Sequence, residues 1–159
     1  MNISIITFTE NGTKLAETFE LLFEKNNRIA YQALQELQNE SEKNNCLSPY
    51  VDRLSDMLDN ENSYIRTRGL VLLVYYAKWD EDYKIDELLD KFLRHITDIK
   101  PITARQCIKL LPILATHKPE LKDAIFSSLY NADISIYDDS MQPLIRKDIQ
   151  KALKEIQKL

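Results

Sequence analysis

The sequence predicts an all-α protein, a right-handed solenoid of about four stacked helical hairpins. Three observations lead to this fold class: an apolar pattern that returns about every 36 to 42 residues, only two glycines, and prolines placed where helices would begin. A period of this length is typical of hairpins that bury their apolar faces only by stacking on one another. The pattern occurs four times, as Ile29-x4-Leu34-x2-Leu37, Ile65-x4-Leu70-x2-Leu73, Ile102-x4-Cys107-x2-Leu110 and Leu144-x4-Ile149-x2-Ala152.

Eight helices follow from the apolar periodicity and the residues that begin and end helices. They are expected at 13–25, 27–43, 49–58, 63–78, 83–97, 101–117, 119–130 and 140–157. Ser48-Pro49 begins the third helix, and polar segments at 59–62 and 133–139 separate the third from the fourth and the seventh from the eighth. Four of the five prolines lie at expected helix starts, where a missing N–H costs least. Since no long linker interrupts the helices, one domain over 1–159 is expected.

The first ten residues alternate in strand fashion at Ile3 and Ile5 and then slip at Ile6. A single strand has no partner in an all-helical chain, so residues 1–12 are expected to form an extended arm or a ragged start to the first helix. The apolar run has no basic flank and is far too short for a signal peptide or a membrane span. We therefore expect a cytoplasmic protein without a membrane partner.

Residues 58–70 combine an acidic turn, an aliphatic–arginine pair, a small residue and a leucine. This segment resembles the HEAT-repeat pattern, which the other units follow in outline. Gln106 and Asp148 stand at the small-residue place, which leaves the register of the last two units open. Residues 100–107 and 139–144 also resemble a group of uncharacterised bacterial HEAT-like proteins. The resemblance implies a HEAT/armadillo-like fold in which the second helix of each hairpin lines a concave surface.

The sequence lacks the motifs of a nucleotide or metal site. Gly12 and Gly69 are isolated, whereas a phosphate loop needs several glycines so that the backbone can approach the phosphates. Zinc sites need cysteine or histidine at close spacing, and none occurs. The adjacent acidic residues Glu81 and Asp82 point apart, which suits the first turn of a helix better than paired catalytic carboxylates. We therefore expect no cofactor, no metal and no catalytic activity.

One catalytic alternative involves Cys107, which could pair with His95 or His117 as nucleophile and base across a hairpin. However, Cys107 occupies the core place of Leu34 and Leu70 in the repeat, which favours a buried, inert thiol. Two widely separated cysteines also suit reduced thiols in a reducing compartment.

Basic side chains recur on the second helix of the hairpins. In the repeat register Gln32, Arg68, Arg105 and Lys147 are equivalent, and Glu36, Leu72, Lys109 and Lys151 follow one turn later. At 100° per residue both rows point away from the core positions, so an exposed basic ladder is expected. The alternative is a solvated face of mixed charge. The candidate partner-binding residues are Arg66, Arg68, Leu72, Arg105, Lys109, Arg146, Lys147 and Lys151.

Aromatic residues at the end of the fourth helix, Tyr75, Tyr76 and Trp79, fit packing in the core and at its rim. The alternative is an exposed aromatic patch that binds a partner.

The charge balance weighs against nucleic acid as the partner, because the net charge is −4 and residues 1–48 carry four basic against seven acidic residues. We therefore expect a non-catalytic adaptor or protein-binding module that holds an extended or helical acidic segment of another protein in its groove. The alternative is a nucleic-acid-directed protein or enzyme that uses the same basic groove. The identity of the partner and the oligomeric state stay open.

Overall fold

A computed structural model describes residues 3–159, including the side chains of residues 12–159. This part of the chain is helical and contains no strand, which confirms the predicted all-α class. The α-helices are α1 Ile3–Glu20, α2 Asn27–Lys43, α3 Val51–Met57, α4 Ser63–Ala77, α5 Lys84–Leu93, α6 Pro101–His117, α7 Lys122–Tyr130 and α8 Gln142–Gln157. Short 3-10 helices extend α1 and α5 (η1 Leu21–Phe23 and η3 Arg94–Thr97) or precede α3 and α7 (η2 Ser48–Tyr50 and η4 Pro119–Leu121).

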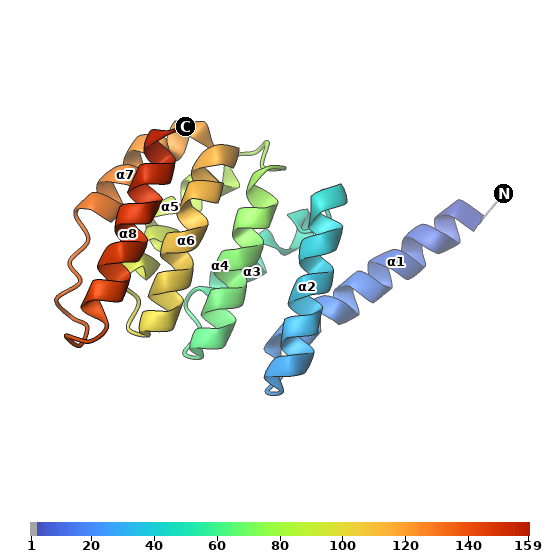
Figure 1. Ribbon diagram of the computed structural model, residues 1–159. Helices are drawn as coiled ribbons and strands as arrows, with labels where there is room; N and C mark the ends of the chain where they lie inside the picture. The colour runs from blue at the N-terminus through green and yellow to red at the C-terminus, as the bar shows by residue number, and fades with distance from the viewer. Residues whose placement is uncertain (1–2) are drawn as a thin grey trace.

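The helices form hairpins stacked in one row, as the sequence predicts for a solenoid (Figure 1). The even-numbered helices lie side by side in one layer, in which α4 contacts α2 and α6, and α6 contacts α8. The odd-numbered helices α3, α5 and α7 lie behind this layer in the view of Figure 1. The second helix of every hairpin is therefore a member of one continuous helical surface.

Two of the eight helices, α2 and α6, have the bounds predicted from the sequence. The main difference is at the N-terminus, where α1 begins at Ile3. Two alternatives were expected for residues 1–12, an extended arm or the start of the first helix, and the structure assigns residues 3–12 to α1.

Side chains that cap the helices fix where α2 and α4 begin. The side-chain oxygen of Asn26 accepts hydrogen bonds from the amides of Arg28 and Ile29 at the start of α2. Asn62 accepts one from the amide of Tyr64 at the start of α4. These are the amides that a helix leaves without an internal partner, so capping stabilises each helix by about 1 kcal/mol.

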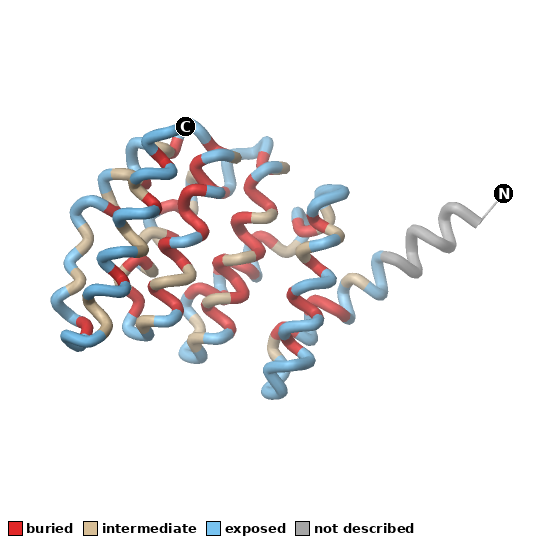
Figure 2. Tube along the Cα trace, viewed as in Figure 1, coloured by how far each residue is buried: buried red, intermediate tan, exposed pale blue. Residues whose placement is uncertain are grey.

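The core runs along the inner side of the even-numbered helices and continues through all units (Figure 2). Leu70, Leu73 and Leu111 are fully buried, in agreement with the apolar pattern. Cys107 is also fully buried, as predicted from its place in the repeat, and its thiol faces the carbonyl oxygen of Phe92.

Gly69 allows α3 and α4 to approach each other closely. A Cβ atom at this position would lie 3.0 Å from Cβ of Met57 and 3.2 Å from the carbonyl oxygen of Leu54. The small-residue place of the repeat is thus a helix crossing in this hairpin.

Among the described residues, no helix is both long enough and apolar enough to cross a membrane.

Candidate functional site

The outward side of α4 exposes apolar side chains. Tyr64, Val71 and Tyr75 are exposed or half-buried, whereas most of the other α4 side chains are buried. With Thr67 they are spaced three or four residues apart, so they share one side of the helix. Because α4 is packed against α2, α3 and α6, this is the side that no neighbouring helix covers.

The outward side of α6 continues this surface. Thr103 contacts Thr67 of α4 through the two side-chain oxygens, 3.0 Å apart, and Arg105 contacts Asp148 of α8. The strip of α6 surface that lies between Thr103 and Arg105 around the helix therefore points away from the stack. It contains Ile102, Lys109, Ile113 and Thr116, all exposed.

In α8 the corresponding side is basic. Leu144, Lys147, Lys151 and Lys154 are exposed and are again three or four residues apart, and the exposed Lys158 directly follows the helix. We call the outward side of α4, α6 and α8 the even-helix face and define it by Tyr64, Val71, Tyr75, Ile102, Lys109, Ile113, Leu144, Lys147 and Lys151.

The charge of the even-numbered helices changes along the stack. Helix α2 carries three glutamates, Glu36, Glu40 and Glu42, against Arg28 and Lys43. Helices α4 and α6 contain no acidic residue. In α8 four basic residues outnumber two acidic ones.

The lysines of the even-helix face are also free to bind. None of Lys109, Lys147 and Lys151 forms an ion pair within the described part of the chain. Their charges are therefore available to an external acidic group.

Three of the predicted partner-binding residues are not on this surface. Arg66, Arg68 and Leu72 are buried, so the expectation that they lie on an exposed ladder is wrong. The guanidinium group of Arg68 donates a hydrogen bond of 2.8 Å to the carbonyl oxygen of Leu22 and one of 3.2 Å to the side chain of Asn27. Burial lowers the pKa of Arg68. Arg68 thus joins the second hairpin to the first.

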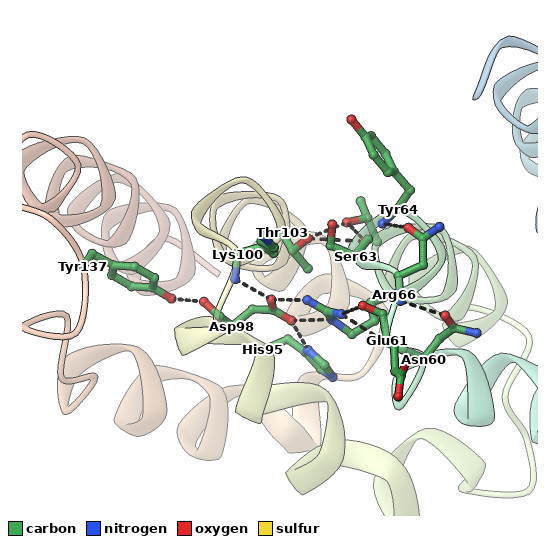
Figure 3. A network of polar contacts seen from close by, with 12 residues as sticks. Asn60, Glu61, Ser63, Tyr64, Arg66, His95, Asp98, Lys100, Thr103 and Tyr137 are labelled. Carbon is green, nitrogen blue, oxygen red and sulfur yellow. Dashed lines mark hydrogen bonds and ion pairs between the residues drawn. The ribbon is translucent and has the colours of Figure 1, made fainter. Parts of the chain in front are cut away.

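Arg66 is the centre of a buried polar network (Figure 3). Its Nε and Nη2 atoms donate to the carboxylate of Asp98 at 2.9 and 2.7 Å, and Nη1 donates to the carbonyl oxygens of Asn60 and Glu61. Nδ1 of His95 lies 2.7 Å from the same carboxylate. Arg66 therefore has a structural role, between the second and third hairpins.

The carboxylate of Asp98 is held in its charged form. Burial alone would raise the pKa of Asp98, but hydrogen bonds from Arg66, from the backbone amide of Lys100 and from His95 outweigh burial and lower this pKa below its ordinary value.

The register explains why the ladder prediction failed at Arg68 and Leu72. Helix α4 begins two residues before Ile65, whereas α6 begins one residue before Ile102. The apolar pattern had paired these two isoleucines, so the second and third units were aligned one residue out of step. One residue rotates a side chain by 100° around the helix, which is enough to exchange an outward for a buried position.

Arg105 is the fourth predicted residue and lies at the edge of the surface. Its Nε atom donates to Asp148 at 2.6 Å, which ties α6 to α8. Lys109, Lys147 and Lys151 are exposed, as predicted. Arg146 is exposed as well, but it precedes Lys147 by one residue and therefore points about 100° away from it around α8.

Sequence reasoning missed the apolar part of the even-helix face. Tyr64, Ile102 and Ile113 are 58%, 73% and 46% exposed, although the periodic pattern predicted Ile102 as a core position. The usable signal was the position of each residue relative to the helix start, because Tyr64 and Ile102 are both the second residue of their helix.

The aromatic end of α4 is mostly packed. Tyr76 is buried, and the indole N–H of Trp79 donates to the carbonyl oxygen of Ser41 at 2.6 Å. Trp79 is half-buried and Lys78 lies over its ring. Of the three aromatic residues, Tyr75 is the one that belongs to the even-helix face.

The described side chains offer little for catalysis. Burial raises the pKa of the Cys107 thiol, which stays protonated and is a poor nucleophile. Burial, with a contribution from the nearby Glu40, raises the pKa of Cys46 to about 11. No group of three or more histidine, cysteine or acidic side chains in the described residues is placed to hold a metal ion.

Comparison with protein families gives a match to a family of helical repeats. The model of the HEAT repeat domain matches residues 2–153, which is almost the whole chain. No curated protein and no solved structure matches it.

Proposed function

Because the chain belongs to the HEAT repeat domain family, whose repeats generally mediate interactions between proteins, we propose that it is a non-catalytic protein-binding module that uses the even-helix face. This proposal keeps the predicted use of the second helix in each hairpin. It replaces Arg66, Arg68 and Leu72 by the side chains that are exposed on that surface.

The observation that carries the proposal is the row of apolar side chains left exposed on adjacent helices. Tyr64, Ile102 and Leu144 are each more than 40% exposed, and each lies in the first turn of an even-numbered helix. Single exposed apolar residues are common on protein surfaces, but contiguous ones mark interaction sites. Covering them would contribute roughly 25 cal/mol for every Å² of apolar surface removed from water.

The basic side chains beside this row favour an acidic partner. Lys109, Lys147 and Lys151 have no acidic neighbour within ion-pair distance among the described residues. A partner that brings carboxylates to them gains favourable electrostatic interactions and is steered to this half of the surface. The negative net charge and the glutamates of α2 weigh against a long polyphosphate backbone as the partner.

Site-specific photo-crosslinking tests the proposal. A benzophenone amino acid replaces Tyr64 or Tyr75 on the even-helix face, or Tyr130 on α7 as the control, because Tyr130 is also strongly exposed. Irradiation in a cytosolic extract should give protein adducts from the first two positions and few from the third. Equal yields from all three positions, or no adduct from the face, would contradict the proposal.

A second measurement separates protein from nucleic acid as the partner. Retention on immobilised DNA is measured as the salt concentration is raised. We expect no retention at near-physiological salt. Retention with a steep salt dependence would instead support a nucleic-acid-directed role, because phosphate contacts release counterions.

A further inference from the structure

We propose that the partner docks as one amphipathic helix lying across α4, α6 and α8, along the row Tyr64–Ile102–Leu144, with its acidic flank toward Lys109, Lys147 and Lys151. This inference rests on the proposed function and adds the conformation, the direction and the charge pattern of the bound segment.

The first argument comes from the hydrogen-bonding groups that the surface lacks. On α4 and α6 the face consists of six residues, which offer two hydroxyl groups and one ammonium group between them: Tyr64, Val71, Tyr75, Ile102, Lys109 and Ile113. An extended segment would leave its backbone N–H and C=O groups without partners here, at about 1–3 kcal/mol for each group removed from water. A helix satisfies those groups internally and needs only apolar contact.

The second argument comes from the spacing of the helices. Packed helices lie about 8–10 Å apart, axis to axis. Residues seven apart in a helix are separated by about 10.5 Å along its axis and lie on nearly the same side. A helix that crosses the stack therefore presents one apolar residue to each of Tyr64, Ile102 and Leu144, at positions i, i+7 and i+14.

The third argument comes from the charges on the two sides of the row. Toward the middle of the helices lie Lys109, Lys147 and Lys151, all exposed. On the other side, the connections that precede α4 and α8 expose Glu61, Asp138 and Asp139, whereas the connection that precedes α6 exposes Lys100. Acidic side chains therefore outnumber basic ones on this side, which favours a bound helix with its acidic flank toward the lysines over the helix with its flanks exchanged.

Mapping of crosslinked residues tests the conformation. The benzophenone side chain is placed at residue 64, 102 or 144 in three separate variants, and the partner residue joined to each is identified by mass spectrometry. For a helix, the joined partner residues should be about seven positions apart from one variant to the next. A spacing of about three positions would show an extended strand, which rises about 3.3 Å per residue, and would overturn the inference while leaving the proposed function intact.

The charge pattern is tested with the same crosslinker at residue 64. Lys109→Glu and Lys147→Glu together should reduce the adduct yield several-fold without lowering the melting temperature. Lys84→Glu and Lys122→Glu, at the starts of α5 and α7, provide the matched control and should leave the yield unchanged. An unchanged yield in the first double variant would overturn the acidic flank. If the crosslinker gives no adduct at residue 64, 102 or 144 in proteins that keep Lys109 and Lys147, the proposed function is refuted instead.

Discussion

The guanidinium group of Arg66 and the carboxylate of Asp98 form a buried, two-pronged ion pair between α4 and the segment that precedes α6. Their side chains are only 9% and 3% exposed. Each charge is tolerated away from water because the other is present, and the planar guanidinium group matches the two carboxylate oxygens.

Removing one partner of this pair should cost more stability than removing both. We expect Asp98→Ala to lower the free energy of unfolding by about 3–5 kcal/mol, because it leaves the Arg66 charge buried. In urea denaturation, the double variant Arg66→Met with Asp98→Leu should lose less stability than Asp98→Ala alone, because it leaves no unpaired charge buried. The exposed pair of Arg53 and Glu20 is the control, where Glu20→Gln should have little effect on stability because water screens the pair. Additive losses at Arg66 and Asp98 would refute the coupling.

Acid should destabilise the protein partly through Asp98. The pKa of Asp98 is lowered in the folded state, so the unfolded chain takes up a proton first as the pH falls. The stabilisation is complete above the unfolded pKa of about 4 and disappears as the pH falls through the lower folded value. Melting temperatures should therefore decrease below about pH 4, and the decrease should be smaller in Asp98→Asn. An identical acid profile in that variant would contradict this contribution.

Gly69 should tolerate neither a large nor a small side chain. Alanine would gain about 1 kcal/mol of helix propensity. The added Cβ would nevertheless meet Cβ of Met57 at 3.0 Å and the backbone oxygen of Leu54 at 3.2 Å, atoms that move only with their helix. We expect Gly69→Ala to be destabilising by up to about 1 kcal/mol and Gly69→Leu by about 1–3 kcal/mol in thermal melts.

Gly12 provides the control for that substitution, because a Cβ there would meet nothing within 4 Å. Gly12→Ala should not lower the melting temperature. If Gly69→Ala raised the melting temperature, α3 would have to move away from α4 to make room for the added Cβ atom.

Charge reversal should have different effects at Arg105 and Lys109. Arg105→Glu places a carboxylate against Asp148, so we expect a loss of about 1–2 kcal/mol, whereas Lys109→Glu should leave stability within about 0.5 kcal/mol. The swapped pair, Arg105→Asp with Asp148→Arg, should recover part of the loss. The measurement is the melting temperature of all four proteins, and equal melting temperatures for the two single variants would rule out a structural role for the Arg105 ion pair.

The sequence was sufficient to predict the helices, because apolar periodicity and helix-starting prolines act locally. It was not sufficient to predict which side of each helix is exposed. Arg66 and Arg68 look like surface residues in a list of charges, but long arginine side chains can be buried when carboxylate and carbonyl groups receive their hydrogen bonds. Those acceptors, Asp98 and the carbonyl oxygen of Leu22, are distant in sequence, and no local pattern relates them to the arginines.

The apolar row was missed because of the repeat register. Ile102 is apolar and falls at a core position of the periodic pattern. Only the start of α6 at Pro101 shows that its side chain lies on the exposed side of the helix. An error of one residue in the repeat register leaves the predicted helices unchanged. It changes which side chains of each helix are predicted to be exposed.

Asp98 touches three consecutive hairpins, through Arg66 of the second, His95 of the third, and the hydroxyl group of Tyr137, which donates to its carbonyl oxygen, in the fourth. Repeat proteins gain stability from contacts between neighbouring units, and their ends can fray one unit at a time where those contacts are independent of one another. A residue shared by three units makes them cooperative, since none can open without breaking the contacts of the others. Amide hydrogens in α4, α6 and α8 should then exchange with solvent at a common free energy of opening, while those of α2 exchange sooner.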